Sequence, residues 1–235
     1  MMSKYSPATD VPSVRQPSFL MPLKGVLILP DLIALNRMAG GRRSANSKLI
    51  HLQETILAEA SGLVEPVAIW ARLDIKHASL LPGKLAGMLS GVEAVIGAVC
   101  TIGEKLEIQS RQYFAEQEYT RGYLLDQVGT LSVATLAQKV AESLRRQHHG
   151  VHWAPGDDAS DLALDAQRLL FDAIPAHRIG VRLTEQNVMT PLKSLSFFLI
   201  MDTNVGGLWC SIPCTRCAWD GMCDKRLQQV PTRDA

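Results

Sequence analysis

The pattern of apolar and polar residues divides the first hundred positions into short strands separated by polar, helix-favouring stretches. Apolar runs with the length of a buried strand occupy 25–30, 67–73 and 92–99. The polar stretch 44–61 has apolar residues at helical spacing, and residues 82–90 favour a second helix. Strands that alternate with helices in this way predict an α/β-like arrangement for this part of the chain.

Between residues 103 and 146 the apolar positions recur at the helical period over two long runs. The inner face predicted for the first helix consists of Leu106, Ser110, Tyr113 and Phe114. The inner face predicted for the second helix consists of Tyr123, Leu124, Val128, Leu131, Ala134, Leu136 and Val140. Small residues, among them Gly129 and Ala137, favour close packing of the second helix against a neighbouring element.

The last third of the chain before the cysteines predicts a turn, a helix and a buried strand. Residues 154–158 contain Pro and Gly and favour a turn, and residues 162–171 favour a helix. An extended region begins at Arg182 and ends in the run 195–201, which is strand-like and carries apolar residues on both faces. Because both faces of that run are apolar, we expect it to lie inside the sheet.

Composition and charge exclude several classes of function. The chain has 235 residues with 24 basic and 23 acidic side chains, so its formal net charge is +1. This balance provides no general attraction to nucleic acid or to an anionic membrane. The longest apolar stretch, 20–35, contains Pro22, Lys24 and Asp31 and is shorter than the ~20 residues that span a bilayer. We therefore expect a cytoplasmic protein with no nucleic-acid or membrane partner, whose first eighteen residues form a loose arm.

Four cysteines near the end of the chain predict a metal site. Cys210, Cys214, Cys217 and Cys223 have the spacing C-x3-C-x2-C-x5-C, whereas Cys100 lies in an apolar run and is interpreted as a buried side chain. Thiolates are soft ligands that bind iron–sulfur clusters and zinc. An iron–sulfur cluster, of the 4Fe–4S type, is the first candidate, and zinc or no metal are the alternatives. Disulfides are disfavoured by the odd number of cysteines and the absence of a secretory leader.

Several separated motifs resemble one known family in their order. The motifs are VCTIGEKL (99–106), YLLDQVG (123–129), WAPG (153–156), IGVRLTE (179–185) and PLKS (191–194). In this order they resemble the activation (reactivation) domain of cobalamin-dependent methionine synthase, and particularly its short stand-alone relatives that end in a cysteine-rich tail. The resemblance covers roughly residues 90 to 225.

The resemblance implies an α+β fold with a twisted, largely antiparallel central sheet flanked by helices. It divides the chain into an arm (1–18), an activation-like domain (19–205) and a metal-binding tail (206–235). In that family S-adenosylmethionine lies in a shallow groove against a corrinoid protein. Cobalt that has been oxidised to cob(II) is reduced by one electron and is then trapped by methylation. The implied function is a redox or reactivation partner of a corrinoid methyltransferase. The alternative is a non-catalytic assembly or binding protein with a structural zinc clip.

The cofactor-binding positions implied by the resemblance are Ala154, Gly156 and Glu185. The chain departs from the family beside them, because His152 replaces an arginine that would meet the ligand carboxylate. Asp157 replaces a tyrosine, and Ala134 replaces an acidic helix residue. A lost charge-assisted hydrogen bond commonly costs about 1.5–3 kcal/mol. We therefore expect S-adenosylmethionine to bind this chain weakly, and the sequence leaves open whether the chain catalyses a chemical step.

Overall fold

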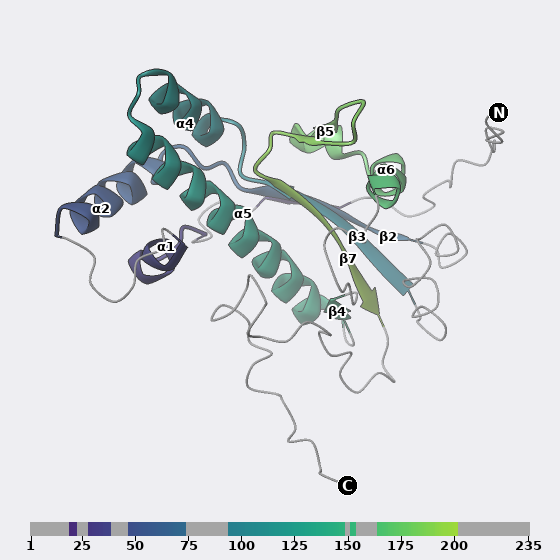
Figure 1. Cartoon of the computed structure of the whole chain (residues 1–235). Helices are drawn as coiled ribbons and strands as arrows, with labels where there is room; N and C mark the ends of the chain where they lie inside the picture. The colour runs from purple at the N-terminus through teal and green to yellow at the C-terminus, as the bar shows by residue number, and fades with distance from the viewer. Residues whose placement is uncertain are drawn as a thin grey trace, which may run out of the picture.

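Five antiparallel strands form the central sheet, and helices lie against both of its faces (Figure 1). The structure is a computed structural model that describes residues 19–22, 28–38, 47–73, 94–148, 151–153 and 164–201. Its elements are β1 (Phe19–Pro22), α1 (Leu32–Met38), α2 (Ser47–Ser61), β2 (Val67–Leu73), β3 (Ala94–Thr101), α4 (Lys105–Ala115), α5 (Tyr119–Gln147), β4 (Val151–Trp153), α6 (Leu164–Ala173), η2 (Ala176–Ile179), β5 (Arg182–Leu183), β6 (Met189–Thr190) and β7 (Ser194–Met201).

The strand order is β1-β2-β3-β7-β4, and every neighbouring pair is antiparallel. Strand β7 lies between β3 and β4, which confirms that the run 195–201 is inside the sheet. The α+β class with an antiparallel sheet is therefore confirmed. The α/β-like arrangement expected for the first part of the chain is wrong, because β2 and β3 pair antiparallel. Alternation of strands and helices along a sequence does not determine the direction in which the strands pair.

The two faces of the sheet are covered by different helices, and successive residues of β3 point to opposite faces. Ile96, Ala98 and Cys100 belong to the core cluster that includes the inner residues of α2, α4 and α5. Val95 and Val99 belong to the second cluster, which includes the buried residues of α6 and η2. All eight residues of β3 are buried, as expected of a central strand that is covered on both faces. Figure 1 shows α5 running along one side of the sheet, with α6 on the other side.

The helices α2, α4, α5 and α6 confirm the four corresponding predictions, with boundaries that differ by a few residues. Leu106, Ser110 and Tyr113 are buried on α4 as expected, but Phe114 is 42% exposed. Tyr123 on α5 was also assigned to the inner face and is 45% exposed. Both assignments were wrong because an aromatic residue at the edge of the apolar stripe of a helix can contact the protein with one side of its ring and stay exposed to solvent on the other. Among the described residues, no helix is long and apolar enough to cross a bilayer.

Two short strands were not predicted. Strand β1 has four residues and ends at Pro22, and β4 has only three residues, so neither gives a clear alternation in the sequence. The predicted strand at 25–30 is not seen at Ile28–Pro30, and residues 23–27 lie outside the described residues, as does the predicted helix 82–90. Asp31 instead caps α1, because its Oδ1 accepts a hydrogen bond of 2.6 Å from the backbone N–H of Ala34.

Close packing of α6 on the sheet requires a residue without a side chain at position 97. A Cβ atom at Gly97 would overlap Cδ1 of Leu170 and would lie 3.1 Å from Cδ1 of Ile174. We expect Gly97→Ala to lower the free energy of unfolding by about 1–3 kcal/mol, because the buried side chains of Leu170 and Ile174 must shift within a tightly packed core. Urea unfolding monitored by circular dichroism measures this change. Gly62→Ala is the control, since a Cβ there would contact only the carbonyl oxygen of Glu59 at 3.7 Å. Equal stabilities of the two variants would contradict the packing argument.

Candidate functional site

Three motifs that are far apart in the sequence meet at one end of the sheet, where β3 ends and β7 begins. They are the end of β3 with Ile102 and Gly103, the first half of α5, and the segment 191–194. Thr101 pairs with Ser194 in the sheet, and the backbone N–H of Ile102 donates a hydrogen bond of 3.2 Å to the carbonyl oxygen of Lys193. The structure thus brings together three of the motifs on which the family resemblance rests.

Two buried hydroxyl groups connect β3 to the segment before β7. Ser194 Oγ lies 3.0 Å from Thr101 Oγ1 and 2.7 Å from the carbonyl oxygen of Pro191. Thr101 Oγ1 also accepts a hydrogen bond of 3.1 Å from the backbone N–H of Gly103, whose φ of 82° is in the left-handed region. A side chain at position 103 would be strained in this conformation, so glycine favours this sharp turn between β3 and α4.

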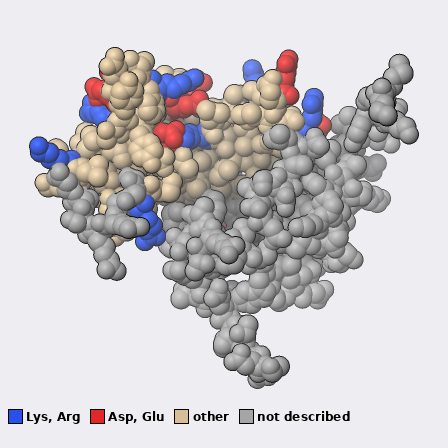
Figure 2. All heavy atoms as spheres, viewed as in Figure 1, with Lys and Arg blue, Asp and Glu red and all other residues tan. Residues whose placement is uncertain are grey.

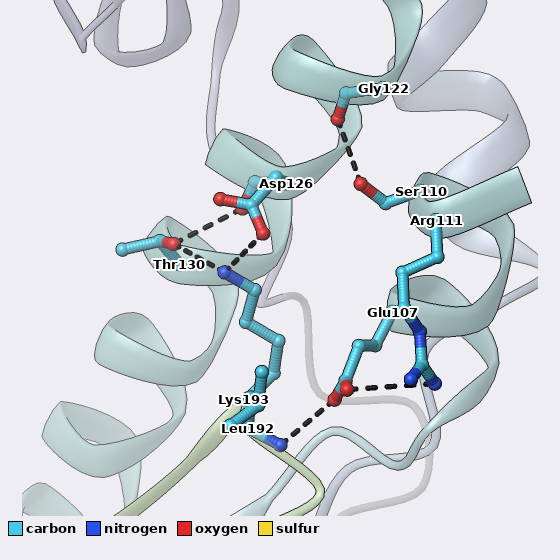
Figure 3. A network of polar contacts seen from close by, with 8 residues as sticks. All are labelled: Glu107, Ser110, Arg111, Gly122, Asp126, Thr130, Leu192 and Lys193. Carbon is cyan, nitrogen blue, oxygen red and sulfur yellow. Dashed lines mark hydrogen bonds and ion pairs between the residues drawn. The ribbon is translucent and has the colours of Figure 1, made fainter. Parts of the chain in front are cut away.

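Lys193 connects the same segment to α5 (Figure 3). Its Nζ atom lies 2.7 Å from Oδ1 of Asp126 and 2.9 Å from Oγ1 of Thr130. The Lys193 side chain is only 13% exposed, whereas that of Asp126 is 42% exposed. Gly129 leaves room for the lysine, since a Cβ there would lie 3.2 Å from Lys193 Cε and 2.7 Å from Cδ2 of Leu106. The small residue thus allows the close packing that the sequence predicted for α5.

Glu107 connects the segment to α4. Its Oε2 accepts a hydrogen bond of 2.8 Å from the backbone N–H of Leu192, and its Oε1 lies 3.6 Å from Nη2 of Arg111 (Figure 3). The Glu107 side chain is 13% exposed. A buried hydrogen bond of 2.9 Å from Ser110 Oγ to the carbonyl oxygen of Gly122 joins α4 to α5. Segment 191–194 is therefore fixed to both helices and to the sheet.

A second polar cluster lies where α2, α4 and α5 meet. The hydroxyl group of Tyr113 lies 2.8 Å from both carboxylate oxygens of Glu59, and the guanidinium of Arg121 lies 5.1 Å from the centre of the Tyr113 ring. Burial, and then the hydrogen bond to Glu59, raises the pKa of Tyr113 above its usual value. This cluster consists of a neutral tyrosine that donates to a carboxylate, and it serves to join the three helices.

Glu185 lies in the turn of the small hairpin formed by β5 and β6, and its side chain is exposed. The turn is closed by a hydrogen bond of 2.9 Å from the backbone N–H of Thr184 to the carbonyl oxygen of Val188. The extended region that was expected from Arg182 onward is therefore interrupted by a hairpin. Exposure leaves the Glu185 carboxylate accessible to a ligand, and no other described residue forms a hydrogen bond or ion pair with it.

The other predicted site residues lie outside the described part of the chain. These are Ala154 and Gly156, and the cysteines Cys210, Cys214, Cys217 and Cys223. Strand β4 ends at Trp153, which pairs with Leu199 and directly precedes the predicted turn. Among the residues that the structure describes, no group of three His, Cys, Asp or Glu side chains could hold a metal ion. Cys100 is buried and free, as predicted.

Sequence reasoning did not identify Lys193, Asp126 and Glu107 as interacting residues. Lys193 and Asp126 both occur in motifs of the family resemblance. The contacts of Lys193 with α5 are long-range, since 63 positions separate Lys193 from Thr130, and a long-range contact leaves no local pattern in the sequence. The signal that could have found Lys193 and Asp126 is the occurrence of a lysine and an aspartate in two motifs of one family pattern, whereas Glu107 lies one residue beyond the first motif.

Comparisons with known proteins show a similarity of structure alone. No family model matches the chain, and no curated protein matches its sequence. Among solved structures, one similar chain is the MetH reactivation domain, crystallised with AdoHcy bound. The TM-score is 0.55 at 10% sequence identity, and the match covers 82% of this chain and 81% of that one. This chain therefore has the fold of that reactivation domain over most of its length.

Proposed function

We propose that this protein is a redox or reactivation partner of a corrinoid methyltransferase system. The observation that carries the proposal is the fold, which matches a reactivation domain over more than four-fifths of both chains. Such a domain has to place a small ligand and a protein-bound corrinoid next to each other. The convergence of three family-like motifs at one end of the sheet further supports this assignment.

The C-terminal cysteines are proposed to bind an iron–sulfur cluster. Four thiols within fourteen residues form a donor set that fits a 4Fe–4S cluster or zinc, since both accept four thiolate ligands. An iron–sulfur cluster would supply single electrons, which the reduction of cob(II) to cob(I) requires. Cys210, Cys214, Cys217 and Cys223 would be its ligands, and such a cluster is consistent with a reducing, cytoplasmic location. If the tail holds zinc instead, the alternative function as a binding protein with a structural clip is favoured.

We propose that this chain binds an adenosyl ligand at the positions that the family resemblance implies. AdoHcy is bound by the MetH reactivation domain. In this chain Ala154, Gly156 and Glu185 would contact the ligand, whereas His152, Ala134 and Asp157 lack the charged or aromatic groups of the family pattern. The ligand would therefore bind less tightly here, by about tenfold for each 1.4 kcal/mol of lost interaction.

The visible surface of the described residues supports a protein partner rather than a polyanion. Figure 2 shows Lys and Arg side chains interspersed with Asp and Glu along the upper rim of this face. Exposed aromatic residues, among them Phe114, Tyr119 and Tyr123, lie at the turn between α4 and α5. Nucleic-acid-binding proteins typically have a patch of basic side chains. On this view of the described residues, the basic side chains do not gather into such a patch.

The direct test is reduction of cob(II)alamin on the corrinoid module of a methionine synthase. The anaerobically reduced protein should convert cob(II)alamin to methylcobalamin when S-adenosylmethionine is added. One electron reduces cob(II) to cob(I), which then takes the methyl group and releases S-adenosylhomocysteine. The methylcobalamin spectrum measures this reaction, and protein with all four tail cysteines changed to serine is the control. Equal rates with the control would contradict the proposal.

A further inference from the structure

The hairpin that carries Glu185 is attached to the rest of the domain at both ends, through the buried Val181 before β5 and through the segment that follows β6. Strand β6 ends at Thr190, and residues 191–193 then lead directly into β7. Within the hairpin, Thr184, Asn187 and Val188 form the hydrogen bonds of the turn. Because Val181 and Met189 pack in the second core cluster beside α6, residues 191–193 are the part of this attachment that reaches α5.

Contacts to α4, to the end of β3 with Ile102, and to α5 hold these residues. The backbone N–H of Leu192 donates to Glu107 on α4 at 2.8 Å. The carbonyl oxygen of Lys193 accepts from the backbone N–H of Ile102 at 3.2 Å. The ammonium group of Lys193 contacts Asp126 at 2.7 Å and Thr130 at 2.9 Å, both on α5 (Figure 3). Lys193 is the side chain that connects the segment to α5.

The environment of Lys193 is built for this contact. Its side chain is 13% exposed, so the charge is largely removed from water and depends on the carboxylate of Asp126. The aliphatic part of the lysine packs on Gly129, where a Cβ atom would lie 3.2 Å from Cε. An ordinary surface lysine needs neither a glycine beneath its side chain nor two partners on one helix.

We propose that Lys193 is a positioning residue, whose ion pair with Asp126 fixes the β5–β6 hairpin and hence Glu185 relative to α5. This inference rests on the proposed function, in which Glu185 contacts the adenosyl ligand. Lys193 acts through the hairpin and has no contact with the ligand itself. Loss of its ammonium group loosens the hairpin on the side of α5 without unfolding the helices and the sheet.

Amide hydrogen exchange separates this role from a general contribution to stability. In Lys193→Met, the amides of Thr184, Asn187 and Val188 should exchange at least ~10 times faster than in the wild type. Amides in the core of α5, such as Leu125 and Val128, should keep their wild-type rates. Lys193→Arg, which keeps the charge, should restore most of the hairpin protection. The matched control is Lys139→Met, which removes an exposed ion pair of 3.5 Å with Glu142 on the same helix.

Titration with S-adenosyl-L-homocysteine then links the hairpin to ligand binding. Lys193→Met should bind this probe at least ~10 times more weakly than the wild type, and Lys139→Met should bind it as the wild type does. Faster exchange by the same factor throughout the domain, or unchanged hairpin exchange, would overturn the positioning role. If the wild type binds the probe and Lys193→Met binds it equally well, this inference fails while the proposed function stands. If the wild type does not bind the probe at millimolar concentration, the proposed ligand is wrong, and the link from Lys193 to binding fails with it.

Discussion

The variant Cys217→Ser is expected to lose both the bound cluster and electron transfer to cob(II)alamin. Cys217 is the third of four thiols within fourteen residues, and a serine hydroxyl is a far poorer ligand for iron than a thiolate. Iron content and visible absorbance measure the loss of the cluster, and the rate of methylcobalamin formation measures the loss of electron transfer.

Cys100→Ala is the matched control for that experiment. It also removes one thiol, but Cys100 lies in β3 with its side chain fully buried in the core. This control should retain iron and visible colour at the wild-type level. Retention of a full complement of iron by Cys217→Ser, or its loss from Cys100→Ala, would show that the tail cysteines do not form the site.

The same buried thiol should make the protein markedly less stable at alkaline pH. Burial raises the pKa of Cys100 from 9.0 to about 12, because the thiolate would lose its hydration inside the core. Above pH 9 the unfolded chain releases this proton while the folded chain keeps it, so stability falls as the pH rises. At ~1.36 kcal/mol per pH unit from pH 9 to pH 12, the loss reaches about 4 kcal/mol.

Comparison of the wild type with Cys100→Ala isolates this effect. The variant has no titrating group at position 100, so its free energy of unfolding should decline less steeply between pH 9 and pH 12. The raised pKa of Tyr113 contributes a loss in the same direction above pH 10, and it is common to both proteins. Urea unfolding at steps of half a pH unit gives the two slopes. Parallel slopes would show that Cys100 ionises in the folded protein as easily as in the unfolded chain.

The central elements could be predicted because their patterns are local. Strands β2, β3 and β7 are predominantly apolar runs, and α4 and α5 repeat apolar residues at the helical period. Strands β1 and β4 were missed because four and three residues are too few to establish a period. The antiparallel order was implied by the family resemblance alone, since hydrogen-bond pairing between β3 and β7 joins residues that are about a hundred positions apart in the chain.

The candidate site was predicted only in part, for a similar physical reason. Glu185 could be assigned from its motif, but its place in an exposed hairpin turn follows from the pairing of β5 with β6, and strands of two residues establish no period in the sequence. The pair formed by Lys193 and Asp126 is a long-range contact between a strand end and a helix, and no local pattern reports it. The predictions for Ala154, Gly156 and the four tail cysteines concern residues outside the described ranges and stay predictions.

The proposed function depends most directly on what the four tail cysteines bind. The decisive measurement is the iron, zinc and acid-labile sulfide content, with the visible absorbance, of protein purified without oxygen. The proposal predicts a brown protein with iron and sulfide in equal amounts, both lost when Cys210, Cys214, Cys217 and Cys223 are all changed to serine. A colourless protein with one zinc per chain would contradict the role as an electron donor and would favour a structural tail.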